Sequence, residues 1–170
     1  MAKWQRAGGA ILALTVALSP AGYRALKSHE GLGQPGASVQ KAYADPYYGW
    51  RIATICYGHT GPDVHAGDNH TDAECKAILE RDLEKSWAAI DQYVTVETDP
   101  WVRAAAADFA LNVGVEAFRR SSFVRLLNQG RVHEACNSLL LWTRAGPQKN
   151  VQGLIRRRQA ERHLCLGEPW

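Results

Sequence analysis

Strong compositional bias is absent from this sequence. Its 170 residues contain no internal repeat, no low-complexity tract and no long linker, which excludes a repeat protein and favours one domain with a single core. Charge of neither sign dominates, and a net charge of +3 is too small to indicate a nucleic-acid partner. Hydrophobic residues make up 46% of the chain, which excludes a disordered protein.

A hydrophobic run long enough for a stable membrane span is also missing. The uncharged stretch of residues 7–23 comes nearest, but ten of its seventeen residues are Ala, Gly, Ser or Thr. A stable span needs about 20 predominantly apolar residues. Lys3 and Arg6 precede the stretch, and a basic flank before an apolar run is typical of an export signal.

Three interpretations of this N-terminal stretch stay open. We favour a weak membrane segment that is not cleaved, over a signal peptide cleaved near Ser19-Pro20-Ala21 and over the buried first helix of a soluble protein. We therefore divide the chain into a signal-anchor or export segment, residues 1–21, and one folded domain, residues 22–170.

Cysteine is scarce but even in number. The four cysteines are Cys56, Cys75, Cys136 and Cys165. An even count behind an export signal favours two disulfides, for which three connectivities exist. The alternative is a metal site, because His59, His65 and His70 lie between the first two cysteines. Their spacing matches no familiar zinc pattern, so we predict neither a metal nor a cofactor.

Strand and helix signals occupy different parts of the chain, which predicts an α+β fold rather than alternating units. A Ser19-Pro20 start and a Gly31 stop predict a helix that carries Glu30 in its last turn, followed by a loop over residues 31–38. Residues 43–61 predict a small antiparallel sheet. The remainder reads as helices: one opened by the Thr71–Glu74 capping box, one opened by Asp99-Pro100, and three over residues 122–128, 132–142 and 151–165. The predicted domain is thus mostly helical, with its sheet near the N-terminal part.

Two details of these helices can be tested. In the helix after residue 71, Asp82 falls among apolar positions and needs a partner if it is buried; the alternative is that it points outward to Arg81 or Lys85. In the helix after residue 99, we expect Trp101 and Phe109 to share one face.

Two carboxylates are placed as cleavage of a glycosidic bond requires. That reaction needs a proton donor for the leaving oxygen and a second carboxylate across the sugar ring. A helix C-terminus disfavours an ionised carboxylate, so Glu30 suits the donor. Asp45 lies at the start of the predicted sheet, and Thr54 further along it offers a hydroxyl that could orient a water molecule.

Several motifs in register resemble the phage lysozyme family, glycoside hydrolase family 24, and most closely its signal-anchor-release endolysins. The motifs are Glu30-Gly31, Tyr43-Ala44-Asp45, the run from Thr54 to Gly61 that contains Gly58-His59, Ala110-Leu111-Asn112-Val113-Gly114, Trp142-Thr143-Arg144-Ala145-Gly146, and Gly153-Leu154 with Arg157-Arg158 and Glu161. Together they cover about residues 22–166 in order.

The resemblance implies roles for particular residues. Glu30 would be the general acid, Asp45 the carboxylate that activates water and Thr54 the residue that positions it. It also implies His59 as the partner of Asp82, and the disulfides Cys56–Cys75 and Cys136–Cys165. These residue assignments are expectations carried over by position.

The resemblance further implies an activity and a location. The family cleaves the β-1,4 bond between N-acetylmuramic acid and N-acetylglucosamine in peptidoglycan with inversion, for bacteriolytic release of phage from the host. A monomer would be exported to the periplasm, initially tethered to the inner membrane. The N-terminal segment contains no cysteine, so thiol exchange between that segment and the active site cannot activate this enzyme.

The chain departs from the family pattern in its spacing. Fourteen residues separate Glu30 from Asp45 and eight separate Asp45 from Thr54, and both intervals are longer than in the family. Loops accept such insertions at low cost, so the role of Glu30 is affected less than that of Asp45. Two rival functions remain: a zinc amidase or peptidase that uses the His/Cys cluster, and a non-enzymatic wall-binding or membrane-lesion protein.

Overall fold

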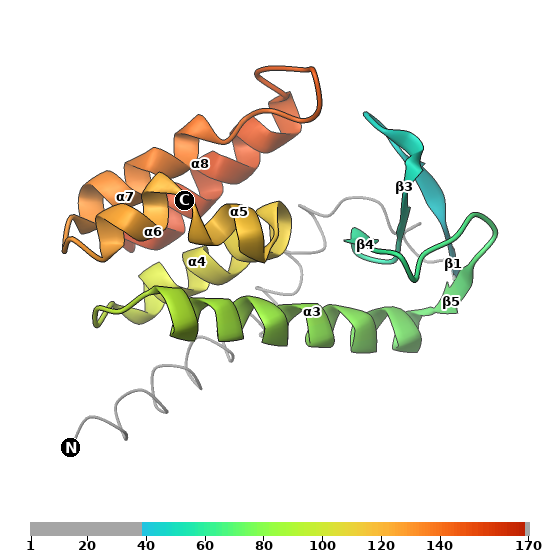
Figure 1. Cartoon of the computed structure of the whole chain (residues 1–170), viewed down its shortest axis with the longest axis horizontal. Helices are drawn as coiled ribbons and strands as arrows, with labels where there is room; N and C mark the ends of the chain where they lie inside the picture. Colours follow the sequence, from blue (N-terminus) through green and yellow to red (C-terminus); the bar gives the residue numbers. More distant parts are fainter. Residues whose placement is uncertain (1–38, 169–170) are drawn as a thin grey trace.

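The computed structural model describes residues 39–168, so the predicted helix that carries Glu30, the loop over 31–38 and the segment 1–21 lie outside the described residues. Short strands come first and helices follow (Figure 1). The strands are β1 (Val39–Lys41), β2 (Tyr43–Asp45), β3 (Gly49–Ile55), β4 (His59–Thr60) and β5 (Asn69–Thr71). The helices are α3 (Asp72–Tyr93), α4 (Pro100–Val113), α5 (Val115–Arg119), α6 (Ser122–Leu127), α7 (Val132–Ser138), the 3-10 helix η1 (Leu139–Leu141) and α8 (Gln152–Leu166).

The strands form two small antiparallel sheets. One has the order β2-β3-β4, which lies within the predicted range of residues 43–61 and confirms the α+β class. The other pairs β1 with β5 in the register Val39 to Thr71, and the sequence did not predict it. Its strands have three residues each and lie far apart in the chain, so neither carries a recognisable alternation.

Helix α3 connects the sheets to the helical part of the molecule (Figure 1). Its 22 residues span about 33 Å. The predicted capping box is present: the Thr71 side chain accepts a hydrogen bond from the Glu74 amide, and Glu74 Oε2 accepts one from the Thr71 amide at 2.7 Å. The hydrogen bond from that amide also lowers the pKa of Glu74. The helix start is thereby fixed directly behind β5.

The core is built around aromatic rings of the helical part. Phe109 of α4 makes edge contacts with Phe118, Phe123 and Trp142, at ring-centre distances of 6.2, 5.7 and 5.2 Å. Trp101, which was expected on the same face of its helix as Phe109, is 48% exposed. It lies in the first turn of α4, where it contacts Gly167 at the end of α8 instead of the core.

The helices predicted after residue 71 are present with small changes at their ends. The stretch 132–142 is α7 followed by one turn of 3-10 helix, and the stretches at 122 and 151 are α6 and α8. Helix α5 was not predicted, and Gly114, at φ +81°, separates it from α4. Within residues 39–168, no helix has both the length and the apolar character needed to cross a membrane.

Charged residues are buried where α4 packs against α8. Arg157, Arg158 and Glu161 of α8 are almost completely buried. Arg157 donates to the Asp108 carboxylate at 2.9 Å and lies 3.2 Å from that of Glu161, and Arg158 donates to the Asn112 side chain. Burial, together with the nearby Asp108 carboxylate, raises the pKa of Glu161 well above its usual range. This network fixes α8 against the last turns of α4.

Candidate active site

Asp45 closes β2 and holds the turn that follows it. Its Oδ1 atom accepts hydrogen bonds from the backbone amides of Tyr47 at 2.7 Å and Tyr48 at 2.8 Å. Aspartate before proline commonly caps a turn in this way, and Pro46 follows it here. Asp45 is half-buried. One carboxylate oxygen is thus committed to the turn.

Thr54 lies on β3 of the same sheet. Tyr43 pairs with Thr54 across the β2–β3 ladder, and Asp45 follows Tyr43 by two positions on β2. The register shifts after Ala44, so that Asp45 lies opposite Gly49 at the turn end of the hairpin. Thr54 is 5% exposed, and its Oγ1 atom has no hydrogen-bond partner among the described residues. A buried hydroxyl of this kind is suited to hold a water molecule.

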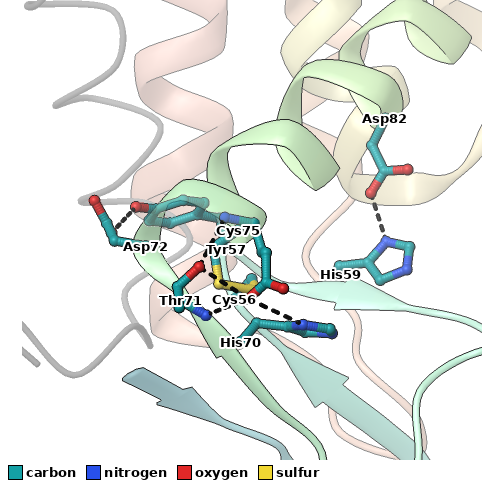
Figure 2. Close-up of a disulfide and its surroundings, with 9 residues drawn as sticks. Cys56, Tyr57, His59, His70, Thr71, Asp72, Cys75 and Asp82 are labelled. Carbon is teal, nitrogen blue, oxygen red and sulfur yellow. Dashed lines mark hydrogen bonds and ion pairs between the residues drawn. A yellow bond between two sulfur atoms is a disulfide. The ribbon is translucent and has the colours of Figure 1, made fainter. Parts of the chain in front are cut away.

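The expected contact between His59 and Asp82 is present (Figure 2). His59 Nδ1 lies 2.5 Å from Asp82 Oδ2, and the carboxylate can only accept, so the ring nitrogen donates. Asp82 is largely buried, and Lys85 donates to its other oxygen at 2.9 Å. On the far side of the ring, His59 Nε2 lies 3.3 Å from Asp63. A hydrogen bond from its own backbone amide and the contact with His59 together lower the pKa of Asp63.

A cavity of about 250 Å³ adjoins this pair. Its polar wall includes His59, Asp82 and Lys85, and its apolar wall includes Leu111 and Val115 at the junction of α4 and α5. Thr60 also lines it and pairs with Thr54 in the β3–β4 ladder, so the cavity lies beside the sheet that carries the candidate catalytic residues, although neither Asp45 nor Thr54 is among its lining residues. The opening therefore runs between the sheet side and the helical side of the molecule.

Both disulfides have the pairing that the resemblance implied. Cys56–Cys75 joins the end of β3 to the first turn of α3, and Cys136–Cys165 joins α7 to α8. Beside the first bridge, Tyr57 Oη donates to Asp72 at 2.8 Å (Figure 2). The Cys56 backbone has φ +57°, a left-handed conformation that favours glycine. The turn between Thr54 and His59 is therefore anchored to α3 at several points.

The structure brings some of the expected site residues together. Asp45 and Thr54 belong to one small sheet, and His59 and Asp82 join that sheet to α3. The position of Glu30 lies outside the described residues. Across residues 39–168, no three His, Cys, Asp or Glu side chains are grouped to hold a metal ion. Sequence analysis missed Asp63 as a second neighbour of His59, although its spacing of four residues from His59 was visible.

A long connecting helix, small antiparallel sheets on one side and a helical core on the other define a lysozyme-like α+β domain. Residues 27–161 match the family model described as phage lysozyme. The chain belongs to the phage lysozyme family.

Relatives and solved structures agree with this assignment. The SAR-endolysin of Bacteriophage PS119 is 44% identical over 115 residues, which cover 68% of this chain and 68% of that protein. The muramidase domain of SpmX from Asticaccaulis excentricus is 34% identical with a TM-score of 0.71, covering 88% of this chain and 97% of that domain. The endolysin from Escherichia coli O157:H7 phage FAHEc1 is 28% identical with a TM-score of 0.71, covering 90% and 96%.

Proposed function

We propose that this protein is an endolysin that hydrolyses the β-1,4 bond between N-acetylmuramic acid and N-acetylglucosamine in peptidoglycan. The observation that carries the proposal is the placement of Asp45 and Thr54 on one sheet, within a family match that also spans Glu30. The Thr54 hydroxyl, which is buried and has no partner within residues 39–168, supports a bound water beside the Asp45 carboxylate. The SAR-endolysin relative and the muramidase-domain neighbour support the substrate class.

The proposed reaction is a single displacement. Glu30 donates its proton to the glycosidic oxygen, and Asp45 takes a proton from the attacking water while the Thr54 hydroxyl orients that water. The water oxygen forms the new bond to the anomeric carbon as the leaving oxygen departs with the Glu30 proton. Because water attacks from the face opposite the leaving group, the configuration inverts.

Digestion of purified peptidoglycan tests this function. We expect new reducing ends on N-acetylmuramic acid, identified by borohydride reduction and mass spectrometry, and an inverted anomer seen by NMR early in the reaction. Glu30→Gln and Asp45→Asn should each lower the rate by about 10²–10⁴-fold without unfolding. The matched control is Glu84→Gln, at an exposed position of α3. Near-normal turnover by Glu30→Gln, or release of peptides instead of sugar ends, contradicts the proposal.

We also propose a route to the substrate. Lys3 and Arg6 would hold the N-terminus in the cytoplasm while residues 7–23 enter the inner membrane. Seventeen residues rise only about 26 Å as a helix, less than the roughly 30 Å hydrocarbon core, and their many small side chains contribute little transfer free energy. The segment would therefore leave the membrane slowly and release a monomeric enzyme into the periplasm with residues 1–21 still attached. The SAR-endolysin relatives support this route.

A further inference from the structure

The tip of the β2–β3 hairpin touches the segment between η1 and α8. A Cβ atom on Gly146 would lie 3.4 Å from Cζ of Tyr48 and 3.5 Å from its Oη, so the tyrosine ring packs directly on the glycine backbone. In Figure 1 the upper end of the β3 hairpin approaches the loop that precedes α8. This contact joins the sheet side of the molecule to its helical side at the end of the hairpin that carries Asp45.

Gly146 is favoured by the backbone conformation of its turn, since a Cβ atom there would only reach ordinary contact with Tyr48. It lies in a tight turn in which Ala145 and Gln148 exchange backbone hydrogen bonds of 3.1 and 3.0 Å. Its φ is +55°, a conformation that residues with a Cβ atom adopt only with strain. The turn therefore presents bare backbone to the Tyr48 ring.

Tyr48 is in turn bonded to the candidate catalytic carboxylate. Its amide donates to Asp45 Oδ1 at 2.8 Å, and its carbonyl accepts from Arg51 Nε at 3.4 Å across the hairpin. Only Pro46 and Tyr47 lie between Asp45 and Tyr48 in the chain. Because the turn is this short, movement of the Tyr48 backbone displaces one of the two amides that hold the Asp45 carboxylate.

We propose that Tyr48 is a positioning residue for Asp45, and that its packing on Gly146 lets the helical side of the molecule set the position of that carboxylate. The inference rests on the proposed function, in which Asp45 activates the attacking water. A catalytic group displaced by about 1 Å can lose up to about 10²-fold in rate, so this contact should affect turnover more than substrate binding.

A double-mutant cycle in turnover tests the inference, with soluble glycan strands as substrate at a temperature where all variants are folded. Tyr48→Ala should lower kcat about tenfold with KM changed less than twofold, and Tyr48→Phe, which keeps the ring contact, should restore kcat. The matched control is Trp101→Ala, which truncates an exposed aromatic residue that is remote in sequence from the hairpin. Gly146→Ala should lower kcat in the wild-type background, because strain at φ +55° shifts the turn on which the Tyr48 ring packs. In the Tyr48→Ala background the same substitution should add no further loss.

Each outcome decides the inference. It is overturned if Tyr48→Ala keeps kcat within twofold, if the loss lies in KM alone, or if the two substitutions act additively on kcat. Failure of the proposed role of Asp45 gives a different result from failure of the positioning role, because Asp45→Asn would then still cleave the glycan strands. An inactive Asp45→Asn with a normal Tyr48→Ala overturns only the positioning role.

Discussion

His59 and Asp82 form a short hydrogen bond that ties the turn after β3 to the middle of α3. The two residues are 23 positions apart in the chain, and Asp82 stands on a helix face whose neighbours are apolar. The contact accounts for a carboxylate at that position, since a buried charge without a partner is costly. It also fixes the short segment between Thr54 and His59.

The first prediction concerns the strength of this pair. His59→Ala and Asp82→Ala should each destabilise the fold, and a double-mutant cycle in urea unfolding should give a coupling of about 1–2 kcal/mol. The pair His65–Asp68 is the control, because both side chains are exposed and their atoms lie 3.7 Å apart, so its coupling should be close to zero. Zero coupling between positions 59 and 82 would show that the contact adds nothing to stability.

The second prediction concerns the Thr54 hydroxyl. Thr54→Val keeps the shape of the side chain and removes an oxygen that has no partner among the described residues. We expect kcat to fall about 10–100-fold. The melting temperature should stay level or rise, because the substitution removes a buried polar group that has no partner among the described residues. Thr54→Ser should retain much more activity than Thr54→Val. A Val variant with unstable structure and normal turnover would mean that the hydroxyl serves the fold.

The third prediction separates the two disulfides. Replacing either pair by alanine should cost about 2–4 kcal/mol of unfolding free energy. At temperatures below the melting temperature, where both variants are folded, only the Cys56–Cys75 replacement should also lower kcat. The reason is that this bridge adjoins Thr54 and His59 in the chain. The Cys136–Cys165 replacement is the internal control. Equal turnover in the two variants would contradict a link between the first bridge and the site.

The fourth prediction follows from the raised pKa of Glu161. The folded protein holds this proton more tightly than the unfolded chain, whose glutamates titrate near about 4.3. The stability contribution is complete below that pH and is lost as pH rises through the folded pKa. In urea unfolding across pH, Glu161→Gln should therefore show a weaker decline of stability with rising pH than the wild type.

Glu74 is the contrasting control for Glu161. Its pKa is lowered by the Thr71 amide, so its contribution is present above the unfolded pKa and is lost as pH falls through the folded pKa. Glu74→Gln should therefore weaken the loss of stability as the pH falls, whereas Glu161→Gln weakens the loss of stability as the pH rises. Identical pH profiles for Glu161→Gln and the wild type would contradict the assignment for Glu161.

The fifth prediction concerns release from the membrane. Replacing Gly8 and Gly9 by leucine adds apolar surface to the proposed anchor and should leave the protein membrane-bound and weakly lytic. The decisive measurement is the mass of the soluble periplasmic form. A mass that includes residues 1–21 supports release of the intact chain, whereas a mass that begins near Gly22 means ordinary signal-peptide cleavage and ends the release hypothesis.

Local patterns were predictable from the sequence, and contacts between distant segments were not. The Thr71 capping box and the Asp99-Pro100 helix start depend on neighbouring residues, so they could be identified directly. The β1–β5 pairing and the packing of Tyr48 on Gly146 depend on segments that meet only after folding. Periodicity predicted the helix face of Trp101 but not its 48% exposure, because exposure depends on how far the neighbouring helices extend.

The site was predictable to a similar degree. Asp45, Thr54 and the His59–Asp82 contact were expected because their motifs resemble a family pattern, not because composition or periodicity required them. The bonding of Asp45 Oδ1 to two amides of its own turn was not expected, since it depends on how the longer hairpin closes. The roles of Glu30, Asp45 and Thr54 stay predictions until the variants are assayed.

The left-handed backbone of Cys56 bears on how this sequence can change over evolutionary time. Any residue with a Cβ atom is strained there by about 1–2 kcal/mol, and the cross-link to Cys75 offsets that strain. Glycine removes the strain without the bridge, so a lineage that loses Cys75 has a low-cost second step at position 56. Cys75 lies in regular helix, where the backbone is not strained, so glycine offers no such gain at that position. We therefore expect descendants without this bridge to carry glycine at position 56 far more often than alanine or serine.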